Sequence, residues 1–461
     1  MPQATLTQPV VELDAILLAL GTRPAAGRTE WLRRGLHQAI VRADLPAGGR
    51  LPGARTLAEA LGVARGTVTA ALDRLCDEGL LTAQARSGYV VAHLPAGASR
   101  PPRPALARTA PSPGVGDLAA FPRGAWLSAV RHALATLSND ELGYGSALGH
   151  RPLRECLAGY LRRTRGAEVD PANLLVVNGV SQALSLLAAV SLDRHLGTWF
   201  VEDPQSPEQR GHLARNRVRI EPLAVDGQGL IPDGIDRPSM VLVTPARQAP
   251  TGVRLSPERR RALLRVATGA GATIVEDDFD GDLPLARDRV SVLQGIAPDR
   301  VVLVGSVSKA LAPGLRLGWI VAPTGWREDL VRARLTGDLS TPVIDQAAFA
   351  HFIDSGAYDR HLGRVRRRYA ARRASLIAAL DRHGLTPMDT SQTGLSVCLR
   401  LDAHHAHQAQ ARLRVLGVPA RVTPAAGHDP GVGYLSVGTA TLTPDSVHAA
   451  AEAIAAAGRE P

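Results

Sequence analysis

Short apolar segments alternate with longer helical patterns between residues 117 and 461. The helical stretches include Ser181–Leu192, Pro257–Thr268 and Tyr358–Leu380. The apolar segments, rich in β-branched side chains, are Leu174–Val177, Trp199–Val201, Met240–Thr244, Thr273–Glu276, Val301–Val304 and Leu317–Val321. Segments that are apolar throughout and alternate with helices are typical of parallel strands covered by helices on both faces. This pattern predicts an α/β domain with a mostly parallel sheet.

Two further regions precede this domain. Residues 1–92 contain short amphipathic helical patterns and a compact turn. Residues 93–116 (HLPAGASRPPRPALARTAPSPGVG) show no hydrophobic periodicity and contain no acidic residue. Their Pro- and Ala-rich composition is typical of a semi-extended linker. We therefore expect an N-terminal domain over 1–92, a linker over 93–116 and a large domain over 117–461.

The composition narrows the class of protein further. Hydrophobic residues make up 45% of the 461 residues and charged residues 21%, as in globular domains with sizeable cores. No apolar run approaches the ~18 residues of a membrane-spanning helix, and Glu12 and Asp14 precede any basic residue, unlike in a secretory signal. The three cysteines lack the spacing of metal ligands and cannot form a disulfide framework. We expect a cytoplasmic protein with no metal site and no membrane contact.

The end of the N-terminal region has the pattern of two short helices followed by a hairpin. Thr56 is suited to cap the first helix, and Gly62 permits a tight turn after it. The inner faces of the two helices are predicted from helical spacing to carry Leu57, Ala60 and Leu61, then Val68, Ala71, Leu72 and Leu75. Leu80–Leu81 and Tyr89–Val91 flank Ser87–Gly88, as the two strands of a wing would. This is a winged helix-turn-helix pattern, whose second helix enters the major groove of DNA.

The stretch RLPGARTLAEALGVARGTVTAALDRLCDEGLL resembles the DNA-binding domain of GntR-type bacterial regulators over its whole length. Ala64 stands where that family usually has Ser, so one helix-capping contact is expected to be missing. The formal net charge of +10 permits an anionic partner without establishing one, so the motif carries the prediction of operator binding. The residues predicted to meet bases or phosphates are Arg65, Thr67 and Thr69, which avoid the apolar stripe, and Arg55, just ahead of the first helix.

The basic residues are 52 arginines and a single lysine, Lys309. A guanidinium cannot replace an amine that must lose its proton and attack a carbonyl, which is a reason to keep one lysine. Lys309 follows the predicted strand Val301–Val304 and lies near Ser306, Ser308 and Arg316. Hydroxyls and a guanidinium suit a phosphate. These surroundings indicate a Schiff base with a phosphorylated aldehyde cofactor, and chance retention of the lysine is the alternative.

Two other predicted strands end in residues that fit the same cofactor. Asp277, in EDDFDGD, ends one strand, where an acid can pair with a protonated pyridine nitrogen. The stretch VVNGVSQAL opens a helix after another strand, so the backbone N–H groups of Gly179, Val180 and Ser181 are available to an anion. Each motif alone is weak, because a strand-end acid is often only a cap and NGVSQ is as readily a simple turn.

Together these motifs resemble those of fold-type I pyridoxal-phosphate enzymes of the aspartate aminotransferase kind. The matching stretches are YGSALGHRPLRECLAGYL, VVNGVSQAL, EDP, TPARQAPTG, EDDFD and SVSKALAPGLRLGW. With the winged helix-turn-helix and the linker, the chain resembles the MocR subfamily of GntR regulators in order and length. The resemblance implies a fold-type I α/β domain with a smaller C-terminal α+β subdomain, homodimers with shared sites, and sensing of pyridoxal 5'-phosphate or a small amino compound.

The same resemblance assigns roles to individual residues. Lys309 would be the Schiff-base lysine, and Asp277 would pair with the pyridine nitrogen. Tyr144 would reach the cofactor phosphate from the partner subunit. The other phosphate-binding groups would be Ser306, Ser308, Arg316 and the amides of Gly179, Val180 and Ser181.

The chain departs from the family around the cofactor ring and the substrate. Phe279 replaces a Tyr that hydrogen-bonds the phenolic oxygen of the cofactor, and Ser206 stands where an aromatic residue is common. Ser436 stands where an Arg usually binds the substrate carboxylate, and Arg421 on a neighbouring strand is a candidate to compensate. Arg247 and Ala249 replace a His and an aromatic residue, so Arg247 is a second candidate to meet an acidic effector.

Three functions remain compatible with the sequence. The leading one is a transcription regulator that binds pyridoxal 5'-phosphate through Lys309 and senses the cofactor or an amino compound. The second is an aminotransferase with an appended DNA-binding module. The departures on the substrate side argue against turnover, whereas the intact Lys309 and Asp277 permit it. The third is a regulator whose large domain has lost the cofactor and only dimerises, which the retained lysine argues against.

Overall fold

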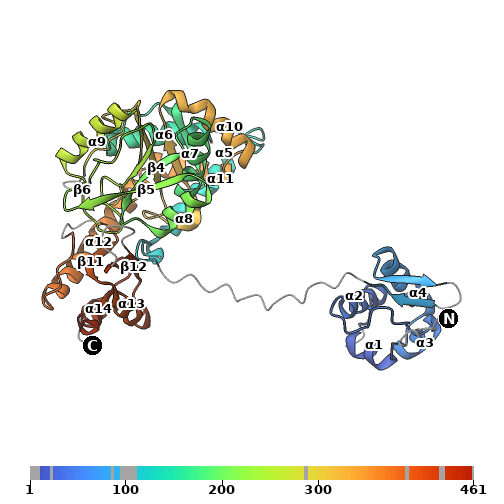
Figure 1. Cartoon of the computed structure of the whole chain (residues 1–461). Helices are drawn as coiled ribbons and strands as arrows, with labels where there is room; N and C mark the ends of the chain where they lie inside the picture. Colours follow the sequence, from blue (N-terminus) through green and yellow to red (C-terminus); the bar gives the residue numbers. More distant parts are fainter. Residues whose placement is uncertain are drawn as a thin grey trace, which may run out of the picture. The chain divides into compact units, whose positions relative to one another are not determined.

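The computed structural model describes residues 11–20, 24–84, 88–93, 112–284, 289–389, 394–424 and 431–458. The chain divides into two compact units, Met1–Arg108 and Thr109–Pro461 (Figure 1). Most of the predicted linker, 94–111, lies outside the described residues, whereas residues 112–116 are part of the second unit. Within the described part of the chain, no helix combines the length and the apolar character needed to cross a membrane.

The N-terminal unit is a helical domain with a two-stranded wing. Its elements are α1 (Leu13–Leu20), α2 (Arg28–Val41), α3 (Ala54–Leu61), α4 (Arg65–Asp77), β1 (Leu81–Gln84) and β2 (Gly88–Val91). The strands pair antiparallel, with Leu81 opposite Val91, and apolar side chains of all six elements share one core. The predicted winged helix-turn-helix is confirmed. Ser87, predicted for the turn of the wing, lies outside the described residues.

The helix-turn-helix differs in detail from the prediction. Gly62 ends α3 in the left-handed conformation (φ 62°), as the predicted tight turn requires, and the predicted apolar stripe of α4 is buried. However, Thr56 does not cap α3. The helix begins two residues earlier, after Gly53, so Thr56 lies in its first turns with an exposed side chain. The buried face of α3 consists of Leu57, Ala58 and Leu61, whereas Ala60, which was predicted to face inward, is exposed.

The second unit is built on an eight-stranded sheet. Its strands, in spatial order, are β3 (Leu174–Val177), β10 (Gly318–Val321), β9 (Val301–Ser306), β8 (Thr273–Asp277), β7 (Met240–Val243), β4 (Thr198–Asp203), β5 (Arg219–Asp226) and β6 (Gly229–Leu230). The central pairs from β9 to β5 are parallel, whereas β10 runs antiparallel to both of its neighbours. All six strands predicted from the sequence are present, and the mostly parallel sheet is confirmed.

Helices cover both faces of this sheet, as Figure 1 shows. On β3, Leu174 and Val176 pack into one core while Leu175 and Val177 pack into another, so alternate side chains face opposite layers. One layer contains α5 (Arg123–Thr136), α6 (Arg151–Arg165), α9 (Pro257–Ala270) and α11 (Val343–Asp354). The other contains α7 (Val180–Asp193), α8 (Pro207–Arg215) and α10 (Arg327–Gly337). Burial on both faces explains why these strands are apolar throughout.

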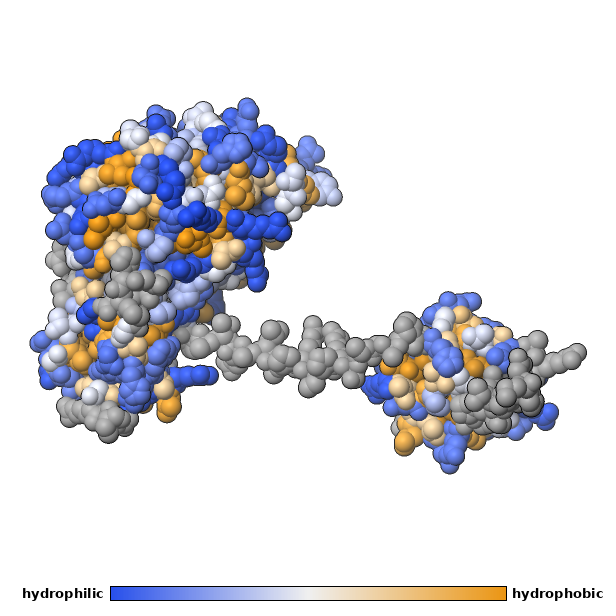
Figure 2. Space-filling view, viewed as in Figure 1, coloured by the Kyte–Doolittle hydropathy of each residue, from blue (hydrophilic) through white to orange (hydrophobic). Residues whose placement is uncertain are grey.

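A smaller α+β subdomain follows, as predicted. Its antiparallel sheet has the order β11 (Ser396–Asp402), β13 (Val432–Gly438) and β12 (Ala420–Pro424). The helices α13 (Ala403–Val415) and α14 (Pro444–Ala457) pack on this sheet. The long helix α12 (Ala357–Asp381) joins the two parts, because Tyr358 belongs to the core of the large sheet and Leu380 to that of the small one. Figure 2 shows hydrophilic side chains over much of the visible face of this unit, with apolar ones scattered among them.

Candidate functional site

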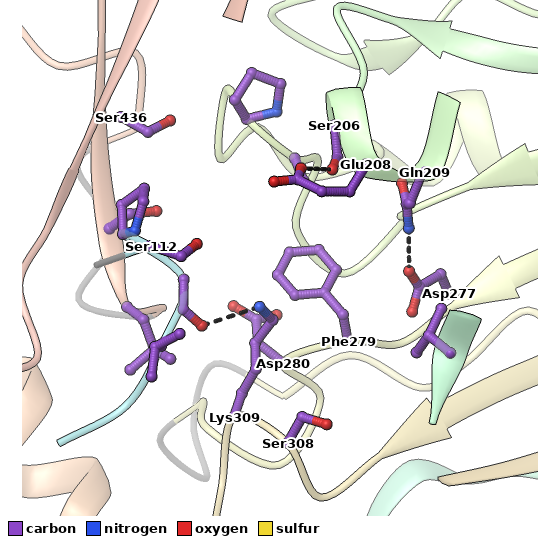
Figure 3. A pocket seen from close by; sticks show the side chains of 18 of the residues that line it. Ser112, Ser206, Glu208, Gln209, Asp277, Phe279, Asp280, Ser308, Lys309 and Ser436 are labelled. Atoms are coloured by element: carbon purple, nitrogen blue, oxygen red, sulfur yellow. Dashed lines mark hydrogen bonds between the residues drawn. The ribbon is translucent and has the colours of Figure 1, made fainter. Parts of the chain in front are cut away.

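A pocket of about 410 Å³ lies beside the carboxyl ends of the parallel strands. Its walls come from residues 112–115, from the first turns of α7 and α8, from the ends of β8 and β9, and from the small sheet (Figure 3). The carboxyl ends of parallel strands are where open α/β sheets bind their ligands, because loops diverge there and the N-termini of helices point inward. The residues that the sequence predicts to bind the cofactor can therefore be compared with the residues that line this one pocket.

Lys309 lies in this pocket, three residues after the end of β9. Its Nζ atom donates a hydrogen bond to the carbonyl oxygen of Gly114 at 3.0 Å, and it lies 5.1 Å from the centre of the Phe279 ring. Burial lowers the pKa of the lysine below its usual range, against the charges of Asp280 and Asp277, which raise it. A lowered pKa makes the neutral amine, the form that can attack a carbonyl, available at lower pH.

Asp277, the last residue of β8, has an unusual environment for a carboxylate. Its Oδ2 atom accepts a hydrogen bond of 2.5 Å from Nε2 of Gln209, whereas its buried Oδ1 atom has no hydrogen-bond partner among the described residues. Burial, with a further contribution from Asp278, raises the pKa of Asp277 to about 7. A buried oxygen without a partner is costly unless a ligand satisfies it. The protonated ring nitrogen of pyridoxal phosphate is a donor of the required kind, so this residue fits the cofactor.

The groups predicted to bind phosphate lie along the same pocket. Ser306, Ser308, Arg316, Val180 and Ser181 all line it. The N-cap of α7 is Gly179, which gives no side-chain hydrogen bond, so the N–H groups of the first turn are available to an anion. These groups also fit the cofactor, whose phosphate needs several donors at one end of the site.

Gly179 and Arg316 are held against each other at this end of the pocket. Arg316 donates from Nη2 to the carbonyl oxygen of Asn178 at 2.6 Å. Gly179 has φ 86°, and a Cβ atom added to it would lie 2.9 Å from Nη2 of Arg316. A residue with a side chain would therefore be strained and would push the guanidinium away.

The residues that depart from the family pattern line the same pocket. The Phe279 ring stands near the amine of Lys309, so this position offers an apolar face and no hydroxyl. Ser206 uses its hydroxyl to donate to Glu208 at 2.8 Å. Ala249 and Ser436 also line the pocket, and Ser436 stands across the view of Figure 3 from Asp277.

The two arginines considered as substitutes for the missing carboxylate-binding Arg differ in their surroundings. Arg247 is buried, pairs with Asp389 at 2.8 Å and with Asp280 at 3.5 Å, and donates to the carbonyl oxygen of Ser396 at 2.7 Å. Its guanidinium is therefore used inside the protein. Arg421 lies opposite Ser436 in the pairing of β12 with β13, and it forms an ion pair with Glu208 of α8.

Other sequence-predicted residues lie away from this pocket. The Tyr144 side chain is 84% exposed and does not line the pocket of its own subunit. On the N-terminal unit, Arg65 is exposed at the start of α4, and Thr67 and Thr69 are half-buried beside it. The expected loss of a capping contact is confirmed, because Ala64 is the N-cap of α4 and gives no side-chain hydrogen bond.

Arg55 needs a small correction. It lies within α3 as its second residue, not ahead of the helix, because α3 begins at Ala54. Its guanidinium is exposed and pairs with Glu59 one turn later at 3.1 Å. The side chain is therefore still on the surface, where a phosphate can reach it.

Several residues of the site were not singled out from the sequence. Gly114, Gln209 and Glu208 contact Lys309, Asp277 and Arg421 from distant parts of the chain. Asp280 lies in the same EDDFDGD motif as Asp277 and forms part of the pocket wall. For Asp280 the acidic motif was an available signal, whereas Gly114 and Gln209 become recognisable only once the fold brings them to the site. Among the described residues, no group of three or more His, Cys, Asp or Glu could hold a metal ion.

Comparison with known protein families divides the chain in the same way. Residues 29–91 match the gntR family of bacterial regulatory proteins, and residues 114–454 match aminotransferases of class I and II. The chain is similar to the probable rhizopine catabolism regulatory protein MocR of Rhizobium meliloti, with 32% identity over 79% of this chain and 80% of the relative. It is also similar to the HTH-type pyridoxine biosynthesis transcriptional regulator PdxR of Corynebacterium glutamicum, with 33% identity over 81% of this chain and 82% of the relative.

Solved structures of several aminotransferases have a fold similar to that of the large unit. The kynurenine aminotransferase of Pyrococcus horikoshii superimposes with a TM-score of 0.67 at 22% identity, over 75% of this chain and 89% of that one. An archaeal alanine:glyoxylate aminotransferase gives 0.66 at 23% identity, over 75% and 89%. At this level of identity the likeness establishes the fold of the large unit.

Proposed function

The chain belongs to the MocR-type branch of the GntR family of transcription regulators, and we propose that its large domain binds pyridoxal 5'-phosphate through Lys309. The observation that carries the proposal is the pair formed by the buried amine of Lys309 and the unpartnered Oδ1 atom of Asp277 in one pocket. The proposed boundaries are a DNA-binding domain over 1–92, a linker over 93–116 and a cofactor domain over 117–461.

Different residues of the pocket would bind different parts of this cofactor. When bound, the cofactor supplies an aldehyde that a primary amine can attack and a ring nitrogen that carries a proton. Lys309 would provide the amine, and Asp277 would accept a hydrogen bond from the protonated ring nitrogen while Gln209 fixes the orientation of its carboxylate. Ser306, Ser308, Arg316 and the first N–H groups of α7 bind the phosphate.

The last residues of the proposed linker offer a route from the cofactor to the DNA-binding domain. The amine of Lys309 is bonded to Gly114, and the N–H of Asp117 donates to the Tyr369 hydroxyl at 2.9 Å. A covalent bond between Nζ of Lys309 and an aldehyde, formed with release of water, would change which hydrogen atoms Nζ can donate to the carbonyl of Gly114, so we expect cofactor binding and the placement of residues 112–117 to be linked. Such linkage regulates DNA binding only where the two states differ in their affinity for the ligand.

Homodimer formation is part of the proposal. Exposed large apolar side chains gather in one stretch of the large domain, which comprises Leu118, Leu127, Leu134, Leu142 and Tyr144. Leu127 and Leu134 lie two turns apart on the same side of α5. Apolar surface of this kind is typical of a protein interface. The position of Tyr144 in this stretch supports its proposed reach into the partner's site.

Operator DNA is the proposed partner of the N-terminal unit, in the cytoplasm. The GntR match supports DNA binding, and the exposed start of α4 supports Arg65, Thr67 and Thr69 as the residues that contact bases or phosphates. Arg55 on α3 is proposed to contact a phosphate. A small amino compound is proposed as a second ligand of the large domain.

Mass spectrometry after borohydride reduction tests the cofactor proposal. Purified protein is incubated with pyridoxal 5'-phosphate, reduced, digested and searched for a pyridoxyl group on each peptide. We expect the group on Lys309 and its loss in Lys309→Ala. Protein that gains no such group with excess cofactor would instead support a large domain that only dimerises.

Turnover is the second candidate function, and the intact pair of Lys309 and Asp277 favours it. The absence of an arginine at Ser436 opposes it. Steady-state assays of amino-group transfer with a broad panel of amino acids decide between the two. Conversion of a substrate by the wild type, but not by Lys309→Ala, would make the protein an aminotransferase.

A further inference from the structure

The wall of the pocket formed by the small sheet carries an arginine where the neighbouring strand carries a serine. Arg421 of β12 and Ser436 of β13 are directly opposed in register, so their side chains project from the same face of the sheet. Thr423, two residues along β12, shares this face, and all three residues line the pocket. A guanidinium on β12 therefore faces the same space as the side chain at position 436.

Three arginines line the pocket in the described part of the chain, and the guanidinium groups of two of them are engaged in other contacts. Arg247 is enclosed by Asp280, Asp389 and the carbonyl of Ser396. Arg316 is bonded to Asn178 beside the N-terminus of α7, at the proposed phosphate end. Arg421 is the remaining guanidinium. Among the described residues, it forms an ion pair with Glu208.

The ion pair between Arg421 and Glu208 is placed so that a ligand can replace it. Glu208 lies in the first turn of α8 on the large domain, whereas Arg421 belongs to the small subdomain, so the pair spans the pocket between them. The side chain of Glu208 is 60% exposed and that of Arg421 is 32% exposed. Exposed ion pairs contribute little to stability, because water screens both charges and holding two long side chains costs entropy. A ligand carboxylate that meets the guanidinium with two parallel hydrogen bonds therefore competes well.

Glu208 has a second hydrogen bond that can hold it once it is displaced. The Ser206 hydroxyl donates to its Oε2 atom at 2.8 Å, while the pair with Arg421 uses Oε1 (Figure 3). Both charges also lie close enough to affect Lys309, since Glu208 raises and Arg421 lowers the pKa of that amine. Lys309, Glu208 and Arg421 line the same pocket, so one small ligand has access to both the amine and the guanidinium.

We propose that Arg421 binds the carboxylate of a carboxylate-bearing amino compound in this pocket, and that this carboxylate displaces Glu208 from the guanidinium. Arg421 thus supplies from β12 the charge that Ser436 does not supply from β13. The inference rests on the proposed function in one respect, namely that the amino group of the same ligand is directed to the cofactor end of the pocket. The class of ligand is an amino acid, as opposed to a simple amine.

Binding of sodium propionate to the full chain, measured by ligand-observed NMR at constant ionic strength, tests this site. Propionate has the carboxylate but no amino group, so it cannot react with an aldehyde, and propionamide is its uncharged control. We expect propionate to bind the wild type, to bind Glu208→Gln several-fold more tightly, and to bind Arg421→Gln at least tenfold more weakly. Propionamide should not distinguish the three proteins. Arg151→Gln, which breaks the exposed pair of Arg151 with Glu155 on α6, is the matched control and should behave as the wild type.

Equal propionate affinity in the wild type and Arg421→Gln would overturn the proposal, and so would absence of binding to both the wild type and Glu208→Gln. The propionate affinity is expected to rise in Glu208→Gln and to fall in Arg421→Gln, and a general loss of folding would not raise it in either variant. This test can fail independently of the cofactor proposal. Propionate binding is measured with and without pyridoxal phosphate, and attachment of the cofactor is measured separately, as the adduct on Lys309. A protein that binds propionate through Arg421 but takes no cofactor would contradict only the latter.

Discussion

The amine of Lys309 donates a hydrogen bond of 3.0 Å to the carbonyl oxygen of Gly114. The two residues are 195 positions apart, and Gly114 lies near the end of the proposed linker, 93–116. The group proposed to react with the cofactor is thus bonded to the part of the second compact unit that is nearest in sequence to the N-terminal unit. The pocket has no room to spare here, because a Cβ atom on Gly114 would lie 2.9 Å from Nζ.

Attachment of pyridoxal phosphate to Lys309 should depend on pH through the amine. Burial lowers the pKa of Lys309, and Asp280 is the charge that most strongly opposes this shift. The rate of attachment should therefore rise with pH and level off below the usual lysine range, since only the neutral amine attacks. In Asp280→Asn the midpoint should move to lower pH. Absorbance spectra recorded over a pH series measure both midpoints.

Asp280→Glu and Asp299→Asn are the controls for this shift. The first keeps the negative charge and should restore the midpoint toward that of the wild type, and the second removes an exposed carboxylate outside the pocket. An unchanged midpoint in Asp280→Asn would mean that its charge does not act on the amine.

Asp277→Asn should weaken cofactor binding while leaving Lys309 able to react. A charge-assisted hydrogen bond to the ring nitrogen is lost, which corresponds to about 1.5–3 kcal/mol, or roughly 10- to 150-fold in affinity. Equilibrium titration with pyridoxal phosphate measures the change. Gln209→Leu should give a smaller loss, because it removes only the partner that orients the carboxylate. Affinity equal to that of the wild type in Asp277→Asn would remove this residue from the cofactor site.

The same carboxylate should make the cofactor-free protein sensitive to pH. The pKa of Asp277 is about 7 in the folded protein and 3.8 is its ordinary value, so the folded state holds a proton that the unfolded state releases between these two pH values. Stability contributed by this group is therefore present below about pH 4 and is lost as pH rises toward 7. Denaturant unfolding measures the free energy of unfolding of the wild type and of Asp277→Asn across this range. As pH rises, the variant should become increasingly stable relative to the wild type.

Much of this site could be predicted from the sequence because its parts are local. Asp277 ends a buried strand and Lys309 follows one by three residues, and an apolar run followed by polar residues marks such positions. The helix start at Gly179 was also visible, since the glycine directly precedes the helical pattern. The fold class followed from the six strands that are buried on both faces.

What could not be predicted depends on distance or on exposure. Gln209 reaches Asp277 across 68 positions, and Glu208 reaches Arg421 across 213. The strand β5 was missed because most of its residues are only partly buried, which leaves no continuous apolar run. Thr56 was assigned to a cap by residue type, whereas Gly53 provides the backbone conformation that starts α3 without a side-chain bond.

Arg65→Ala should weaken specific binding to the operator. Arg65 is exposed at the first turn of α4, where the second helix of the motif meets the major groove. If it contacts a base, the loss is about 1–3 kcal/mol, and binding to unrelated DNA should change less. Fluorescence anisotropy at fixed salt measures both, and Arg42→Ala, an exposed arginine just after α2, is the control. An operator affinity that matches that of the control would exclude Arg65 from base contacts.

Gly179→Ala should disturb the phosphate end of the pocket. The position has φ 86°, and the added Cβ atom would lie 2.9 Å from Nη2 of Arg316. Backbone strain of about 1–2 kcal/mol and displacement of the guanidinium should both appear, as lower stability and weaker cofactor binding. Gly159→Ala on α6 has open space around it and should leave cofactor binding unchanged. Denaturant unfolding and cofactor titration give the two readouts, and equal cofactor affinity in both variants would contradict the assigned phosphate site.

Subunit mixing tests whether Tyr144 completes the site of a partner. Its side chain is 84% exposed on the single chain and lies outside the subunit's own pocket. If it reaches the partner's phosphate, Tyr144→Ala homodimers should bind the cofactor more weakly, and Lys309→Ala homodimers should form no adduct. A heterodimer of the two variants keeps one subunit with an intact Lys309 facing an intact Tyr144, so it should regain one full-affinity site per dimer. Leu416→Ala, also exposed but outside the stretch 118–144, is the matched control. If mixing restores no adduct at low cofactor concentration although mixed dimers form, Tyr144 acts within its own chain or not at all.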